Sequence, residues 1–139
     1  MSKAEVSYVR SYVPADKHLI LSSWLLGLYY GDTLYSLIDK DTFMKYYHQV
    51  LESIVDSGKC KINVMCDRED SNIVMGYSVL SSDANVLHWV YVKPKFRGYK
   101  VATDLVPETV KTVTHLTKAG ISILKKKKLA YNPFVLGVN

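Results

Sequence analysis

Residues 86–102 carry the side chains and the main-chain turn that could bind an anion. A predicted strand ends at Pro94, and a basic turn containing Gly98 leads directly into a helix expected to begin at about Val101. The first amides of a helix have no partner within it and carry partial positive charge, so this turn could hold a phosphate or pyrophosphate. Gly98 would let the main chain approach the ligand closely. Cationic side chains that could add to the binding are Lys95, Arg97 and Lys100.

At these residues the sequence resembles the GNAT superfamily of acyl-coenzyme-A-dependent N-acyltransferases. The motif of that family is a strand, a Val-x-Pro step, and then (Gln/Arg)-x-x-Gly-x-(Gly/Ala) before a helix. Val92-Lys93-Pro94 and residues 97–102 occupy these positions here. Arg97 and Ala102 match the motif, whereas Lys100 stands where the central glycine is expected.

The resemblance covers about residues 5–117. The segment around Tyr131 looks most like small phage-encoded members of the superfamily. The family often has a tyrosine that serves as general acid on the helix after the fifth strand, and the helix predicted at 118–127 has none. The resemblance therefore leaves open whether catalysis is retained.

The resemblance implies that the chain binds acetyl-coenzyme A and transfers the acetyl group to a primary amine that the sequence does not identify. Main-chain groups of Val90, Tyr91 and Val92 would bind the pantetheine arm, where the fourth and fifth strands splay apart. We expect direct attack in a ternary complex, because no cysteine or serine nucleophile with an orienting base is recognisable. The pyrophosphate would be held by the turn formed by Arg97, Gly98, Tyr99, Lys100, Val101 and Ala102.

Acyl transfer to an amine also needs a general base, a general acid and a donor to the oxyanion. His88 is the first candidate base, because it lies on the fourth strand with the parity of Val90, and imidazole titrates near neutral pH. The alternative is a histidine hydrogen-bonded within a half-buried sheet. His115 on the neighbouring strand is a second candidate base. Tyr131 could protonate the departing thiolate if the last segment folds back over the cleft, or it could simply pack on the sheet.

The elements that must position these residues are read from periodicity and turn signals. They predict an α/β chain of the α+β kind, one domain over residues 1–139, with a mixed and mainly antiparallel sheet, helices on both faces and one parallel crossover. Asp41 is the expected N-cap of the second helix, and Pro107 should shorten or kink the third. The predicted strands are 5–13, 61–66, 73–80, 86–92, 112–117 and the extended segment 129–138, and the predicted helices are 16–31, 42–56, 101–110 and 118–127.

Length, composition and cysteine spacing indicate which broad classes of protein this sequence can belong to. A chain of 139 residues with 48% hydrophobic residues can bury a core as one domain. The longest mainly apolar stretch, 19–30, falls short of the ~20 residues that a membrane span needs, and the charges before it do not fit a signal peptide. We expect a cytoplasmic protein, in the host cytoplasm if it is viral. Cys60 and Cys66 bracket one strand about 20 Å apart, so we expect neither a disulfide nor a metal site.

Two other functions stay open. The net charge of +5 and the run Lys125 to Lys128 could bind nucleic acid, with aromatic side chains such as Tyr99 stacking on bases, although such a run is usually a solvated helix end. A fold member that has lost catalysis and survives as a binding or virion component is the other alternative. Either a monomer or a homodimer fits the sequence.

Overall fold

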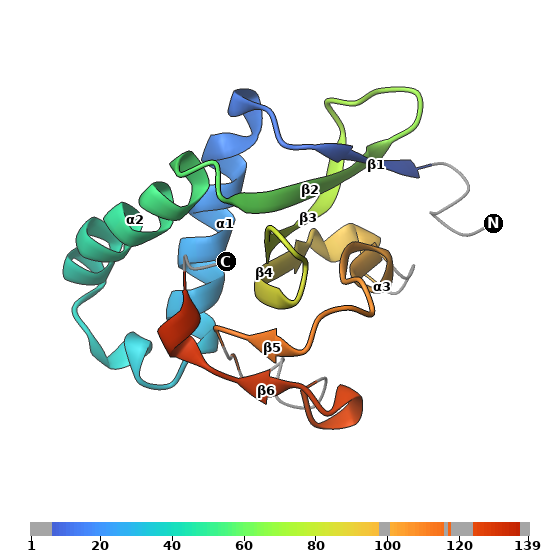
Figure 1. Cartoon of the computed structure of the whole chain (residues 1–139). Helices are drawn as coiled ribbons and strands as arrows, with labels where there is room; N and C mark the ends of the chain where they lie inside the picture. Colours follow the sequence, from blue (N-terminus) through green and yellow to red (C-terminus); the bar gives the residue numbers. More distant parts are fainter. Residues whose placement is uncertain (1–6, 98–100, 116, 118–123, 137–139) are drawn as a thin grey trace.

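A mixed sheet of six strands forms the centre of the molecule (Figure 1). The computed structural model describes residues 7–97, 101–115, 117 and 124–136. Strand order in the sheet follows chain order: β1 to β4 pair antiparallel, while β4 with β5 and β5 with β6 pair parallel. The strands are β1 (Ser7–Ser11), β2 (Cys60–Asp67), β3 (Val74–Ser81), β4 (Val86–Val92), β5 (Thr112–Val113) and β6 (Ala130–Tyr131).

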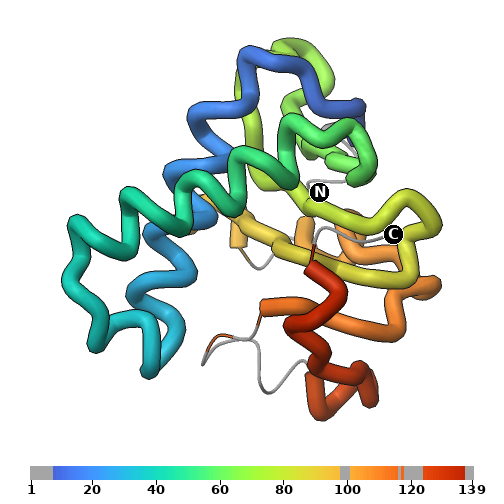
Figure 2. The backbone as a smooth tube through the Cα atoms, turned by 60° about the vertical axis from the view of Figure 1, so that its left-hand side comes forward, coloured from blue at the N-terminus to red at the C-terminus, as the bar shows by residue number. Residues whose placement is uncertain are grey.

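Helices cover both faces of this sheet (Figures 1 and 2). On one face lie α1 (Lys17–Gly31) and α2 (Lys40–Asp56), which contact each other, and on the other lies α3 (Val101–Leu105), which contacts β2, β3 and β4. The predicted α+β class with a mainly antiparallel sheet is therefore confirmed. Short 3-10 turns lie at Pro14–Asp16, Tyr35–Leu37, Pro94–Phe96 and Pro133–Val135.

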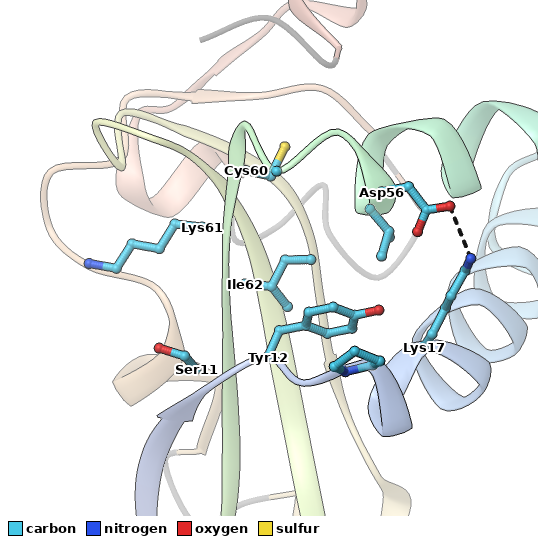
Figure 3. A pocket seen from close by; sticks show the side chains of 10 residues that line it. Ser11, Tyr12, Lys17, Asp56, Cys60, Lys61 and Ile62 are labelled. Carbon is cyan, nitrogen blue, oxygen red and sulfur yellow. Dashed lines mark hydrogen bonds and ion pairs between the residues drawn. The ribbon is translucent and has the colours of Figure 1, made fainter.

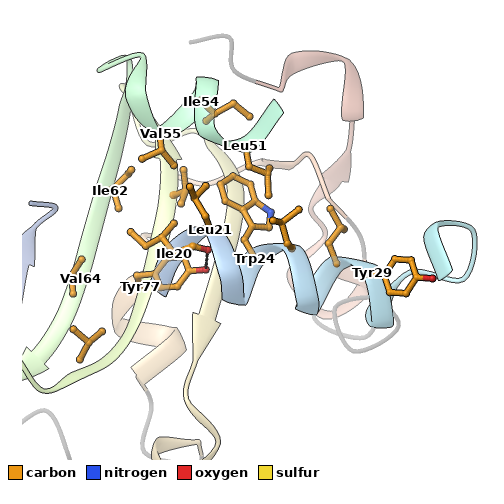
Figure 4. Packing of buried hydrophobic residues seen from close by; sticks show 14 of the residues in the cluster. Ile20, Leu21, Trp24, Tyr29, Leu51, Ile54, Val55, Ile62, Val64 and Tyr77 are labelled. Carbon is orange, nitrogen blue, oxygen red and sulfur yellow. Dashed lines mark hydrogen bonds between the residues drawn. The ribbon is translucent and has the colours of Figure 1, made fainter. Parts of the chain in front are cut away.

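The main core lies between the sheet, α1 and α2. Figure 4 shows Ile20 of α1 beside Tyr77 of β3, and Trp24 of α1 pointing toward Leu51 of α2. The buried Tyr77 hydroxyl lies 3.0 Å from the Ile20 carbonyl oxygen and 2.7 Å from the Ser23 hydroxyl, so its polar atom is satisfied. Because these bonds join α1 to β3, they fix the height of the helix over the sheet. A second core under α3 contains Met65, Met75, Val92, Phe96, Val101 and Leu105.

Two glycines allow elements to approach closely around β4. A Cβ on Gly27 of α1 would lie 2.8 Å from Cζ2 of Trp89, so the absence of a side chain lets the helix rest directly on that ring. A Cβ on Gly76 of β3 would lie 2.5 Å from the carbonyl oxygen of Tyr91. The helix α1 and the neighbouring strand β3 therefore both approach β4 at contact distance.

Several predicted bounds change in the structure. The N-cap of α2 is Asp39 rather than Asp41, because the Asp39 carboxylate accepts the Thr42 N–H at 3.0 Å. The third helix ends at Leu105, before Pro107, instead of reaching residue 110. The fifth strand ends at Val113 rather than 117, and a second parallel pairing, between β5 and β6, was not predicted. Of the helix predicted at 118–127, residues 124–127 are described and are helical.

Within the described ranges, none of the helices combines the length and apolar character needed to cross a bilayer. The described Cys60 and Cys66 are both free thiols, as expected, with Cys66 buried and Cys60 half-buried.

Candidate active site

The parallel strands β4 and β5 separate soon after they meet. Their pairing consists of Val86 with Thr112 and Leu87 with Val113, and the Thr114 N–H then donates to the Leu87 carbonyl at 3.1 Å. The strand β4 continues to Val92 with no further strand pairing on that side among the described residues. We call this side of β4 at residues 88–92, which has no strand partner among the described residues, the β4–β5 gap.

A bulge in β4 coincides with this separation. Val79 of β3 pairs with Trp89, but the next residue, Leu80, pairs with Leu87, so His88 is an extra residue in β4. A bulge bends its strand and redirects the side chains beside it. The bend therefore lies at the residue where β4 leaves β5.

The register of β3 with β4 determines which main-chain groups face the gap. Lys93 donates its N–H to the Met75 carbonyl at 2.9 Å, and successive residues of an antiparallel strand alternate in direction. The groups of Tyr91 therefore point toward β3, whereas those of Val90 and Val92 point away from it. Of the three residues predicted to bind a pantetheine arm, Val90 and Val92 have main-chain groups that face the gap.

Arg97 lies at the far end of the gap. Its Nε donates to the Val92 carbonyl at 2.9 Å, and the residue is exposed. Val101, the first residue of α3, is buried, while Ala102 is exposed. Because α3 is short, its aligned peptide dipoles are fewer than the sequence predicted. Gly98, Tyr99 and Lys100, also predicted for the pyrophosphate turn, lie outside the described residues.

Four side chains from three segments form a hydrogen-bonded chain where the gap begins. The Tyr47 hydroxyl on α2 lies 2.8 Å from Nε2 of His115. Nδ1 of His115 lies 3.0 Å from the His88 carbonyl oxygen and 3.1 Å from the Thr114 hydroxyl. That hydroxyl in turn lies 3.1 Å from Nδ1 of His88. The two histidines named as candidate bases are thus brought together through Thr114.

Burial sets the protonation of both histidines. It lowers the pKa of His88 to about 4. Burial also lowers the pKa of His115 to about 4, although the bond to the His88 carbonyl acts in the opposite direction. Both rings are therefore neutral at pH 7, and each is a weaker base there than the near-neutral imidazole that the sequence suggested.

Tyr131 lies one strand further out. It lies on β6, where it pairs with Val113 of β5, and 49% of its surface is exposed. Partial burial, and then the nearby Tyr35 and Asp32, raise its pKa, so the phenol is protonated at neutral pH. Burial is the main cause that raises the pKa of Tyr47, Tyr35 is the next, and Tyr131 and Asp32 add smaller effects. Tyr131 is therefore near the α2 end of the hydrogen-bonded chain.

Comparison with known proteins gives matches in structure only. No protein-family model and no curated protein matches the sequence. A solved structure described as a possible acetyltransferase from Clostridium difficile 630 is 16% identical, with 88% of each chain covered and a TM-score of 0.55. A GCN5-related N-acetyltransferase from Rhodopseudomonas palustris is 15% identical over 73% of this chain and 61% of its own, with a TM-score of 0.46. The chain has the GNAT fold.

A third similar structure of this fold is the Salmonella typhimurium protein yncA, provisionally assigned as an acetyltransferase and solved with its cofactor acetyl-CoA. It is 17% identical over 75% of this chain and 61% of its own, with a TM-score of 0.45. The matched region thus covers about three fifths of the Rhodopseudomonas palustris and Salmonella typhimurium proteins. At these low identities the similarity is one of fold and not of sequence.

Two surface pockets of this GNAT-fold chain lie away from the β4–β5 gap. One, of about 550 Å³, lies where β1 and β2 meet the end of α2 and is lined on one side by the ion pair of 3.0 Å between Lys17 and Asp56 (Figure 3). The other, of about 450 Å³, lies beside Val106, Lys111 and Lys128. Neither is lined by His88, Val90 or Arg97. In the described part of the chain, no group of three or more His, Cys, Asp or Glu side chains could hold a metal ion.

Neither Thr114 nor Tyr47 was among the site residues predicted from the sequence. Tyr47 and His115 are 68 positions apart. Their contact depends on how α2 crosses the end of β5, which no local periodicity encodes. The one available signal was the pair Thr114-His115, two polar residues inside a run predicted to be a strand.

Proposed function

We propose that this protein is an N-acyltransferase that transfers an acetyl group from acetyl-coenzyme A to a primary amine. The observation that carries the proposal is the separation of β4 from β5 after Leu87, which leaves the main-chain groups of Val90 and Val92 directed into a gap. An extended amide-containing chain can pair with such an edge in the way that a missing strand would. The GNAT fold of the chain supports the proposal that the ligand at this gap is an acyl-coenzyme A.

The proposed cofactor position follows the edge of β4. The pantetheine arm pairs with Val90 and Val92, and the pyrophosphate lies at the turn that begins with Arg97, where Gly98, Tyr99, Lys100, Val101 and Ala102 complete the proposed site. Arg97 is exposed and anchored by a bond from its Nε to the Val92 carbonyl, so its remaining guanidinium donors can bind an anion. The thioester then lies toward the other end of the gap, near His88.

The proposed reaction is direct attack in a ternary complex. The amine nitrogen bonds to the thioester carbon, and the carbonyl electron pair moves to oxygen. When that pair returns, the carbon–sulfur bond breaks and the thiolate leaves. The attacking amine gives up one proton and the thiolate takes one up, so the overall exchange is balanced. Tyr131 is the proposed acid for the thiolate: its phenol is protonated at neutral pH, although its raised pKa makes it a weaker acid than an ordinary tyrosine.

The proton from the amine has no strong acceptor among the named residues. His88 and His115 have pKa values lowered to about 4 by burial, so either would accept a proton only weakly at pH 7. We therefore propose that the amine attacks in its neutral form, after its ammonium form has lost a proton to solvent, and that the proton released from the nitrogen after attack returns through solvent to Tyr131. This predicts a rate that rises with pH toward the pKa of the acceptor amine.

The test is a titration followed by turnover. Acetyl-coenzyme A should bind saturably in calorimetry and raise the melting temperature, while a duplex or single-stranded oligonucleotide at equal concentration should not. Thiol release with a panel of primary amines then separates an active enzyme from a fold member that binds without turnover. Binding of the oligonucleotide alone would instead support the nucleic-acid alternative.

A further inference from the structure

The hydrogen-bonded chain at the start of the gap fixes the position of each proton. A carbonyl oxygen only accepts, so Nδ1 of His115, 3.0 Å from the His88 carbonyl oxygen, must carry a proton. In the neutral ring Nε2 is then the acceptor, and the Tyr47 hydroxyl donates to it. His115 thus has the Nδ1–H tautomer.

The same reasoning extends through Thr114 to His88. Nδ1–H of His115 also points to the Thr114 hydroxyl at 3.1 Å, so that oxygen accepts from His115 and its own proton is free to donate. Among the described residues the remaining partner of the hydroxyl is Nδ1 of His88, at 3.1 Å, so the arrangement that uses the hydroxyl proton makes Nδ1 of His88 the acceptor. In this arrangement the neutral His88 ring carries its proton on Nε2. The two histidines then have opposite tautomers, because the Thr114 hydroxyl accepts a hydrogen bond from one ring and donates one to the other.

This Nε2–H of His88 is a buried donor without an acceptor. The side chain of His88 is 1% exposed, and no group of the described chain bonds to its Nε2. Leaving a buried donor unpaired is costly, and such groups call for a specific explanation. The donor belongs to the bulged residue at which β4 leaves β5, beside the main-chain groups of Val90 that face the gap. The missing acceptor would therefore come from a molecule that enters the gap.

We propose that His88 is a catalytic residue that donates its Nε2–H to the thioester carbonyl oxygen of the acyl donor, and that Thr114, His115 and Tyr47 are positioning residues that hold it in this tautomer. The proposal rests on the proposed function. Along β4, His88 lies about 13 Å from Val92, at the end of the gap opposite the turn that begins with Arg97. When the amine attacks, the carbonyl electron pair moves onto the oxygen, and the hydrogen bond strengthens as that charge develops.

The role differs from that of a general base in ways that can be measured. A donor in a neutral ring gives up no proton to the reaction, so it functions at any pH at which the ring stays neutral. It also requires an acceptor on the ligand. Coenzyme A has the same pyrophosphate and pantetheine arm as acetyl-coenzyme A but lacks the carbonyl, which makes it the matched control ligand. A ketone analogue of acetyl-coenzyme A keeps the carbonyl and cannot be turned over.

The first experiment is nitrogen-15 NMR on histidine-labelled protein, with His18 and His48 as internal controls. We expect the Nε2–H tautomer for His88 and the Nδ1–H tautomer for His115. The ketone analogue should shift the His88 Nε2 and attached proton resonances, and coenzyme A should not. Thr114→Val should make His88 a mixture of tautomers, and Thr114→Ser, which keeps the hydroxyl, should restore the single form.

The second experiment compares affinities. In the unmodified protein the ketone analogue should bind more tightly than coenzyme A, and His88→Phe should reduce that ratio about tenfold, whereas His88→Gln, which keeps an N–H donor, should retain part of it. If both ligands bind and the ratio is unchanged in His88→Phe, a buried water or no ligand at all pairs with His88, and the inference is wrong. If neither ligand binds the unmodified protein, the proposed function itself fails.

Discussion

His115 donates a hydrogen bond from Nδ1 to the carbonyl oxygen of His88, at 3.0 Å, across the point where β4 and β5 part. In a parallel ladder a backbone amide of the neighbouring strand would bond to β4 there. A side chain has taken the place of that amide. The chain after Val113 is thereby released from the sheet while the first carbonyl beyond the paired residues stays satisfied.

This relationship predicts that His115 contributes strongly to stability. His115→Ala would leave the Tyr47 hydroxyl and the His88 carbonyl without their partner and open a cavity against Trp24, whose ring lies 5.6 Å from that of His115. We expect a loss of about 2–4 kcal/mol in the free energy of unfolding. Tyr47→Phe, which removes the hydroxyl and keeps the ring, should cost about 1 kcal/mol. Urea denaturation measures both, and equal losses in the two variants would contradict this account.

The buried histidines also predict an acid-sensitive fold. Burial lowers the pKa of His88 and of His115 to about 4, from 6.5 in the unfolded chain. Below pH 6.5 the unfolded state therefore binds protons that the folded state does not, so stability is complete above that pH and is lost as the pH falls toward 4. The slope is at most about 1.4 kcal/mol per pH unit for each histidine.

Urea denaturation at pH 7.5, 5.5 and 4.5 tests this linkage. His88→Phe and His115→Phe should each flatten the pH dependence between 6.5 and 4. His18→Gln, which replaces an exposed histidine of α1, is the matched control for the loss of a histidine. A slope that persists in the double variant His88→Phe/His115→Phe would assign the acid sensitivity to other groups.

The proposed pyrophosphate site predicts unequal effects for two neighbouring cations. Arg97→Glu should reverse the charge beside the proposed anion and remove the bond to the Val92 carbonyl, and we expect at least a tenfold loss of affinity for coenzyme A. Lys95→Glu changes the net charge by the same amount, but at a position two residues earlier. The ammonium of Lys95 lies 5.1 Å from the centre of the Phe96 ring. This substitution should weaken binding less. Calorimetry measures the affinities, and equal effects of the two variants would indicate a general charge effect rather than a site at Arg97.

The strands of the antiparallel half were predictable because alternation and polar turns encode them locally. The predicted strand 86–92 matches β4 residue for residue, and 61–66 and 73–80 differ from β2 and β3 by one residue at each end. The N-cap of α2 was missed because Asp39 and Asp41 are both suitable cap residues. The hydrogen bond to the Thr42 N–H decides between them, and it is visible only in the folded chain.

The site was less predictable than the fold. The sequence identified His88 and His115 as residues of interest, but their burial comes from packing against distant segments, and that burial makes them neutral. The bulge at His88 has no signal in the alternation of residues 86–92, which reads as an uninterrupted strand. The end of β5 at Val113 likewise depends on Leu87 and on the His115 side chain, whose partners on β4 and α2 are 27 and 68 residues away.

The contact between Gly27 and Trp89 allows a test of whether the packing of α1 against β4 affects ligand binding at the gap. Trp89 stacks on Trp24 with ring centres 6.1 Å apart, and its ring centre lies 6.3 Å from that of His115. Gly27→Ala should stabilise the helix itself by about 1 kcal/mol, so a net loss of stability would come from the new Cβ pushing the Trp89 ring, which it would meet at 2.8 Å.

We expect the steric effect to prevail in Gly27→Ala, with a net destabilisation of about 1–2 kcal/mol. The displaced indole should also change the near-ultraviolet circular dichroism and weaken binding of coenzyme A, because Trp89 belongs to the strand that lines the gap. Leu26→Ala, at an exposed position one residue earlier in α1, should change neither signal. An unchanged spectrum in Gly27→Ala, together with a gain in stability, would show that the helix can lift from the sheet at this point without disturbing β4.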